Sequence, residues 1–184
     1  MLTATRQRLN LSSGIGLSVV TAGDPANPAV LLLHGFPSSA NTFRDVIPVL
    51  AKTAYVIAPD LPGYGQSDVL PSASFAAFGE AISEMLARLD VGPLYLYLHD
   101  YGAPVGFHVA MNAPDRVLGL IIQNANAHRT GFGPQWADTL AYWARPTPEN
   151  AAAATAHLTL EGTRDQYVAG VPADVAARIS PQGW

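Results

Sequence analysis

Residues 94–112, LYLYLHDYGAPVGFHVAMN, decide the fold. Leu94–Leu98 is an apolar burst too short for a helix, which is typical of a strand buried in a sheet. The next four residues contain Asp100 and Gly102, residue types that favour a tight turn. Pro104 stands where a helix can begin, because its missing N–H would have no partner in the first helical turn. The segment therefore predicts a strand, a sharp turn and a helix.

The same alternation runs through the first two thirds of the chain. Phe75–Leu89 has apolar residues at helical spacing and is stopped by Gly92 and Pro93. This alternation predicts an α/β fold, with a mostly parallel sheet and helices on both faces. The expected strands, besides Leu94–Leu98, are Leu17–Thr21, Val30–Leu33, Tyr55–Ala58, Val117–Gln123 and a polar first strand at Arg6–Leu11.

The sequence pattern changes after Asn124: aromatic residues and prolines are scattered, and no further short apolar run resembles a strand. We expect two parts: residues 1–126 as the sheet-containing core and residues 127–184 as a partial helical cap.

Composition excludes several classes of protein. The 184 residues carry 10 Lys and Arg against 14 Asp and Glu, so the formal net charge is −4. With a single lysine, Lys52, the chain has no basic patch, and neither nucleic acid nor a membrane is an expected partner. The absence of cysteine excludes disulfides and thiol nucleophiles. No apolar run approaches the roughly 18 residues that a membrane span needs, and a cytoplasmic location is expected.

Three short motifs follow three of the expected strands. They are His34-Gly-Phe-Pro37, the loop from Asp60 to Ser67, and His99-Asp-Tyr-Gly102. The carboxyl ends of parallel strands are where open α/β sheets bind ligands. We therefore expect the three motifs to meet at one edge of the sheet.

Together the motifs resemble the α/β-hydrolase superfamily, and within it the branch with an aspartate nucleophile, the epoxide hydrolases and haloalkane dehalogenases. The resemblance covers most of residues 17–126. It implies an α/β-hydrolase fold with Asp100 as the nucleophile on a strand-to-helix elbow. It also implies an oxyanion hole made by the backbone N–H groups of Phe36 and Tyr101. Leu98 departs from the pattern, which prefers glycine at that position.

Structural interpretations of the same residues stay open at this stage. Asp100 is also a favoured residue type for capping the helix that follows it. His34 suits a tight turn in which its ring bonds loop carbonyls, and the resemblance gives it a structural role beside the oxyanion loop. The glycines and proline of the Asp60–Ser67 loop dictate turns, so we assign that loop no catalysis.

No cofactor or metal is expected. The glycines of the Asp60–Ser67 loop lack the third glycine of a dinucleotide-binding motif. The five histidines show no paired helical spacing of the kind that binds metals.

Hydrolysis of an aspartyl ester needs a general base, normally a histidine held by a carboxylate. Only His108, His128 and His157 follow Asp100, and none follows a late strand. We therefore expect a truncated chain without the catalytic acid and base. The alternative is a non-catalytic module for ligand binding or assembly. Truncation would leave Val117–Gln123 as an exposed edge, and self-association through it is expected.

The expected substrate is a small hydrophobic molecule, with an epoxide favoured over a haloalkane. The Phe36 side chain has no donor for a halide, whereas His-Gly-Phe-Pro resembles epoxide hydrolases. Tyr142 and Tyr167 in the cap are candidates to protonate an epoxide oxygen. Trp136 and Trp143 keep the dehalogenase alternative open. These four residues and His34 are the substrate-binding candidates.

Overall fold

A computed structural model describes residues 4–181 of the chain. The chain divides into two compact units between Ala127 and His128. The first contains the sheet and the second is helical, and each is described by itself below.

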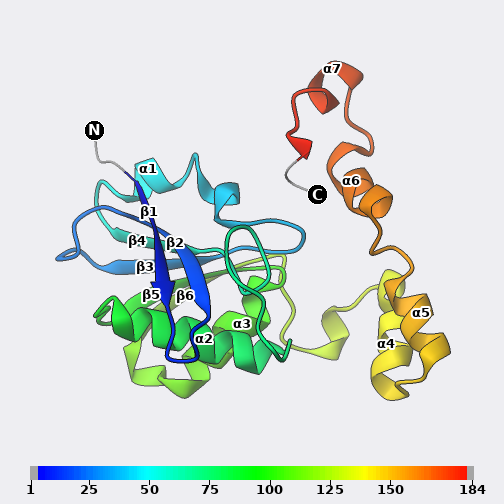
Figure 1. Cartoon of the computed structure of the whole chain (residues 1–184), viewed down its shortest axis with the longest axis horizontal. Helices are drawn as coiled ribbons and strands as arrows, with labels where there is room; N and C mark the ends of the chain where they lie inside the picture. The colour runs from blue at the N-terminus through cyan, green and yellow to red at the C-terminus, as the bar shows by residue number, and fades with distance from the viewer. Residues whose placement is uncertain (1–3, 182–184) are drawn as a thin grey trace. The chain divides into compact units, whose positions relative to one another are not determined.

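One six-stranded sheet organises the first unit (Figure 1), with the strand order β1-β2-β4-β3-β5-β6. β1 pairs antiparallel with β2, and β2 antiparallel with β4, whereas β4, β3, β5 and β6 run parallel. The α/β class and the mostly parallel sheet expected from the sequence are confirmed. The strands are β1 Thr5–Asn10, β2 Gly16–Ala22, β3 Ala29–Leu33, β4 Tyr55–Pro59, β5 Leu94–His99 and β6 Val117–Gln123.

Helices cover both faces of this sheet (Figure 1). α2 (Phe75–Arg88) and α3 (Gly102–Asn112) pack together on one face, and the short helices η1 (Ala40–Phe43) and α1 (Ile47–Leu50) lie on the other. α2 is the helix predicted from residue 75. α3 begins two residues before Pro104, and the two short helices were not predicted, because four residues are too few to show a helical period.

β3 runs through the middle of the core, and all five of its residues are buried. Leu31 and Leu33 face α2 and α3, whereas Val30 and Leu32 face η1 and α1. Burial of each such side chain contributes about 1.5–3 kcal/mol. In the parallel register Leu33 lies opposite Leu98. The loops that follow β3 and β5 therefore leave the sheet side by side.

β6, unlike β3, is largely exposed. It ends the strand order and pairs with β5 alone. Leu118, Leu120 and Ile122 are 51%, 44% and 54% exposed. β6 therefore lies at an edge of the sheet with its apolar side chains about half exposed. The expected apolar edge at Val117–Gln123 is present.

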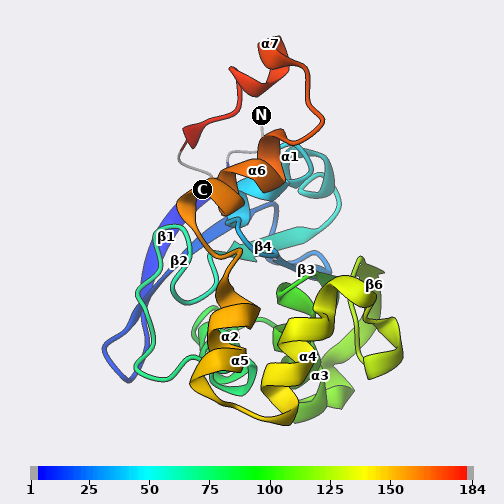
Figure 2. The same ribbon diagram turned by 90° about the vertical axis from the view of Figure 1, so that its right-hand side faces the viewer.

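The second unit consists of helices and connecting turns. α4 (Ala137–Ala144) and α5 (Pro148–Thr155) lie side by side (Figure 2), and α6 (Leu160–Val168) and α7 (Ala173–Ala176) follow. Thr147 and Thr159 cap the amino ends of α5 and α6 with their side-chain oxygens. Within residues 4–181, no helix is long and apolar enough to cross a membrane.

The exposed edge predicts self-association of this chain. An uncharged, apolar edge strand offers unpaired backbone groups to a second copy. We expect Leu120→Lys to shift the chain from dimers or larger species toward monomers in size-exclusion chromatography. Val49→Lys, at a 60% exposed apolar position on α1, is the matched control and leaves the elution unchanged. A monodisperse, cooperatively melting monomer for the unmodified chain would contradict this expectation.

Candidate active site

Asp100 occupies the turn between β5 and α3, with a backbone φ of +49°. This left-handed conformation is uncommon for a residue with a side chain, although aspartate adopts it more readily than most. The residue that caps α3 is Tyr101, and no side chain caps that helix. The interpretation of Asp100 as a helix cap is therefore wrong, and its carboxylate bonds elsewhere.

Glycines make room for this elbow. A Cβ at Gly35 would lie 2.5 Å from the Asp100 Cβ, and a Cβ at Gly102 would lie 2.5 Å from the carbonyl oxygen of Leu33. A Cβ at Gly106 would overlap the side chain of Leu98. Gly106 thus accommodates the leucine where the family's pattern prefers glycine. The sequence analysis missed Gly106, because its role depends on how α3 packs on β5.

The Asp100 carboxylate is held by the loop that follows β3. The Phe36 N–H donates a hydrogen bond to Asp100 Oδ1 at 2.8 Å. Both residues expected in an oxyanion hole therefore lie beside Asp100: Phe36 through this hydrogen bond, and Tyr101 as the next residue in the chain. The bond fixes Oδ1 and leaves Oδ2 as the oxygen not engaged by Phe36.

His34 is fully buried, and backbone groups use both of its ring nitrogens. Nδ1–H donates to the Gly35 carbonyl and Nε2 accepts from the Leu61 N–H, both at 2.9 Å. Burial lowers the pKa of His34, although the Gly35 hydrogen bond opposes the shift. The ring is therefore neutral and structural. Both ring nitrogens are thus used within the protein, and the substrate-binding role of His34 stays a prediction.

Aromatic rings surround the elbow. Tyr101 packs against Phe36 and Phe75 at centroid distances of 5.7 and 5.4 Å, and Tyr64 packs edge-on against His34 and Phe36. Burial, followed by the Tyr101 and Asp100 charges, raises the pKa of Tyr64 to about 12. Burial and the Asp100 charge also raise the pKa of Tyr101. Both phenols therefore stay neutral near neutral pH, and the surroundings of Asp100 are largely apolar.

The cap candidates belong to the second unit. Trp136 and Trp143 pack with Phe132, at centroid distances of 4.9 Å for Phe132–Trp136 and 5.6 Å for Phe132–Trp143. The structure thus brings the two tryptophans together. Tyr142 on α4 and Tyr167 on α6 are half-buried. The substrate-contacting roles of these four residues stay predictions.

Within the first unit, no described hydrogen bond joins His99 or His108 to the Asp100 carboxylate. His99 Nδ1 lies 3.1 Å from the Gln123 carbonyl oxygen, and His108 packs beside Gly79 between α3 and α2. His128 and His157 are exposed in the second unit. Among residues 4–181, no group of three or more His, Asp or Glu could hold a metal ion.

The family model for the α/β-hydrolase fold matches residues 28–177. This match spans the four parallel strands β3, β4, β5 and β6, the elbow and most of the helical unit. The chain belongs to the α/β-hydrolase fold family. Hydrolase relatives agree with this assignment.

An uncharacterized hydrolase of Saccharomyces cerevisiae, YNR064C, is 38% identical over 145 residues, which cover 77% of this chain and 50% of that protein. A haloalkane dehalogenase of Mesorhizobium japonicum is 41% identical, over 56% of this chain and 34% of its own length. Epoxide hydrolase 2 of Siraitia grosvenorii is 34% identical, over 64% and 37%. The chain thus spans between a third and a half of the length of these relatives.

Gly102→Ala tests the packing of the elbow. Alanine in a helix is normally more stable than glycine by about 1 kcal/mol. Here the added methyl group would press on the Leu33 and His34 carbonyl oxygens. We expect a net loss of about 1–3 kcal/mol in the free energy of unfolding, measured by denaturant titration. Gly92→Ala is the control, because a Cβ there meets nothing within 4 Å; equal effects at both sites would refute the account.

The lowered pKa of His34 predicts a pH dependence of stability. Below about pH 6.5 the unfolded chain binds a proton at this histidine, whereas the native chain does not. The free energy of unfolding therefore falls as the pH drops from 6.5 toward the lowered native pKa, by up to about 1.4 kcal/mol per pH unit. Above pH 6.5 His34 adds no dependence.

We expect His34→Gln to remove this contribution and to lower stability at pH 8 by about 1–3 kcal/mol, because buried donors lose partners. His157→Gln, at an exposed side chain, is the control and keeps the slope. An unchanged slope in His34→Gln, measured by denaturant titration from pH 5 to 8, would show that His34 titrates alike in both states.

Proposed function

We propose that this chain provides the nucleophile and oxyanion elements of a hydrolase that opens epoxides through an ester on Asp100. The observation that carries the proposal is the Asp100 carboxylate on its left-handed turn, with Oδ1 bound by the Phe36 N–H. The position holds an aspartate and no serine, which disfavours an esterase of the serine type.

In the first step, Oδ2 of Asp100 attacks a ring carbon of the epoxide. A C–O bond forms, the ring C–O bond at that carbon breaks, and its electron pair stays on the ring oxygen. That oxygen takes a proton and becomes a hydroxyl group. Tyr142 and Tyr167 are the proposed proton donors. The product of this step is a hydroxyalkyl ester of Asp100.

In the second step, water attacks the ester carbonyl carbon, and negative charge develops on Oδ1. The N–H groups of Phe36 and Tyr101 would stabilise this oxyanion, and removal of one such donor typically raises the barrier by about 2.7–4 kcal/mol. The base that activates water is not assigned to a residue of this chain. We therefore expect the ester to accumulate on the chain as given.

A small hydrophobic epoxide suits the site better than a haloalkane. The rings of Phe36, Tyr101, Tyr64 and Phe75 gather around the elbow. A departing halide needs N–H or similar donors, and the Phe36 side chain has none.

Haloalkane dehalogenation is the second candidate. The 41% identity to a haloalkane dehalogenase and the adjacent Trp136 and Trp143 favour it. In that reaction the same carboxylate oxygen displaces a halide from carbon. A non-catalytic binding module remains the third candidate, and covalent trapping separates it from both enzymes.

Mass spectrometry of the intact chain tests the proposal. Incubation with styrene oxide should add the mass of one whole epoxide, whereas a bromoalkane would add its alkyl group without bromine. Asp100→Asn should abolish the adduct, because the amide is a poor nucleophile. Asp90→Asn is the matched control, since Asp90 also has a positive φ of 53° and is exposed.

Loss of the adduct in Asp100→Asn alone supports the proposal. An alkyl adduct on the chain from the bromoalkane, without an adduct from styrene oxide, would favour haloalkane dehalogenation. A folded wild-type chain that gains no mass from either reagent, or an adduct that survives in Asp100→Asn, would overturn the nucleophile assignment.

A further inference from the structure

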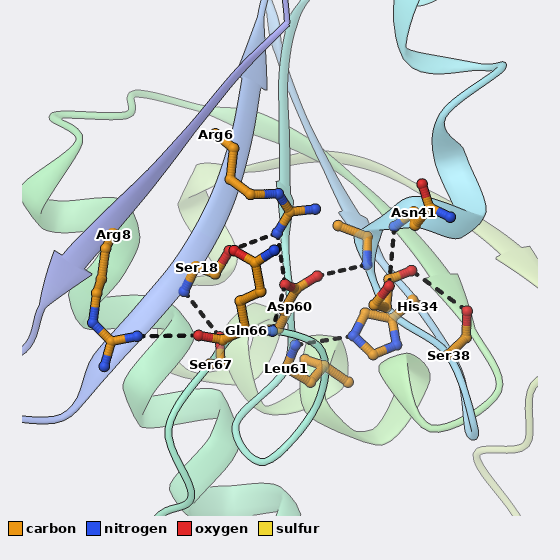
Figure 3. A network of polar contacts seen from close by, with 12 residues as sticks. Arg6, Arg8, Ser18, His34, Ser38, Asn41, Asp60, Leu61, Gln66 and Ser67 are labelled. Atoms are coloured by element: carbon orange, nitrogen blue, oxygen red, sulfur yellow. Dashed lines mark hydrogen bonds and ion pairs between the residues drawn. The ribbon is translucent and has the colours of Figure 1, made fainter. Parts of the chain in front are cut away.

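Asp60 is a buried carboxylate that the proposed reaction does not use. It follows β4, and its side chain is 1% exposed. Oδ1 accepts from the Ala40 N–H at 2.9 Å, and Oδ2 accepts from the Gln66 N–H at 3.0 Å. Arg6 Nη1 on β1 bonds Oδ2 at 2.7 Å and also bonds Ser18 (Figure 3). A buried carboxylate is stable only with such partners, so Asp60 fixes the segments that supply them.

The loop that carries Phe36 is held at both ends by hydrogen bonds to two consecutive residues, Asp60 and Leu61. Asp60 holds Ala40 at the far end. The next residue, Leu61, donates its N–H to His34 at the near end (Figure 3). His34 in turn donates to the Gly35 carbonyl. Phe36 lies between these two fastenings, and its N–H reaches Asp100.

We infer that Asp60 is a positioning residue for the nucleophile, acting through the loop from His34 to Ala40. Held at residues 34 and 40, the loop keeps the Phe36 N–H directed at Asp100 Oδ1. Arg6 secures Asp60 from the first strand. The inference deepens the proposed function and rests on it for its kinetic test. Asp60 touches neither Asp100 nor a reacting atom among the described contacts.

A second ion pair, two residues further along β1, serves as a comparison for Arg6 and Asp60. Arg8 pairs with Asp68, whose carboxylate also accepts from the Gly16 N–H at 2.8 Å. Like Asp60, Asp68 ties β1 to the loop after β4. Unlike Asp60, its side chain makes no described hydrogen bond to residues 34–40. The Asp68 side chain is 43% exposed and that of Asp60 1%, so the second pair controls for the tie between β1 and the loop after β4, and the rate constant and amide exchange at Phe36 report on positioning.

The kinetic test measures the rate of Asp100 alkylation by styrene oxide across a range of concentrations. In Asp60→Asn one acceptor oxygen becomes an NH₂ group, and the loop loses a fastening. We expect the rate constant at saturation to fall by about tenfold or more, since small misplacements of reacting groups are costly. The half-saturating concentration should stay unchanged. A merely structural role would lower the amount of adduct rather than its rate constant. Asp68→Asn should alkylate at the wild-type rate.

Hydrogen exchange at the Phe36 amide gives a readout that does not need alkylation. We expect faster exchange in Asp60→Asn and wild-type exchange in Asp68→Asn. If the wild-type chain forms no adduct, the proposed function fails and this readout alone decides the positioning role. If Asp60→Asn does not fold, Arg6→Gln against Arg8→Gln repeats both measurements at partly exposed side chains. The inference would be overturned if Asp60→Asn and Asp68→Asn, or Arg6→Gln and Arg8→Gln, had equal alkylation rate constants and equal exchange at the Phe36 amide. It would also be overturned if exchange became faster in Asp60→Asn while the alkylation rate constant stayed unchanged.

Discussion

The hydrogen bond from the Phe36 N–H to the Asp100 carboxylate joins two loops that lie 64 residues apart in the chain. The bond forms because β3 and β5 are parallel neighbours whose carboxyl ends coincide. It also needs Asp100 to adopt a positive φ, and Gly35 and Gly102 to leave room for the turn. This one hydrogen bond thus depends on the register of the sheet, on the turn at Asp100 and on the two glycines.

Hydrophobic burial supplies the framework for that contact. Leu31 and Leu33 of β3 and the leucines of β5 face α2 and α3, and the opposite face is closed by η1 and α1. Polar contacts then fix the loops that emerge from this framework. Both ring nitrogens of His34 and both carboxylate oxygens of Asp60 are used by neighbouring segments. The apolar surroundings of Asp100 form the proposed substrate site, whereas the hydrogen bonds of His34 and Asp60 hold the neighbouring loops in place.

Sequence patterns predicted much of this framework. The strands appeared as short apolar bursts, and α2 as a clear helical period. The elbow around Asp100 was evident because its turn residues directly follow such a burst. Other features depend on partners distant in the chain. Gly106 makes room for Leu98 only because α3 crosses β5, and the second ring nitrogen of His34 is occupied only because the Leu61 N–H reaches it. The short helices between residues 40 and 50 carry too little periodicity to be predicted.

A crystal structure of the chain after reaction with an epoxide would test the central claim most directly. The account predicts an ester bond at Oδ2 of Asp100, with Oδ1 still within hydrogen-bond distance of the Phe36 N–H. An adduct on another side chain, or an ester on Asp100 whose remaining oxygen is turned away from that amide, would contradict it.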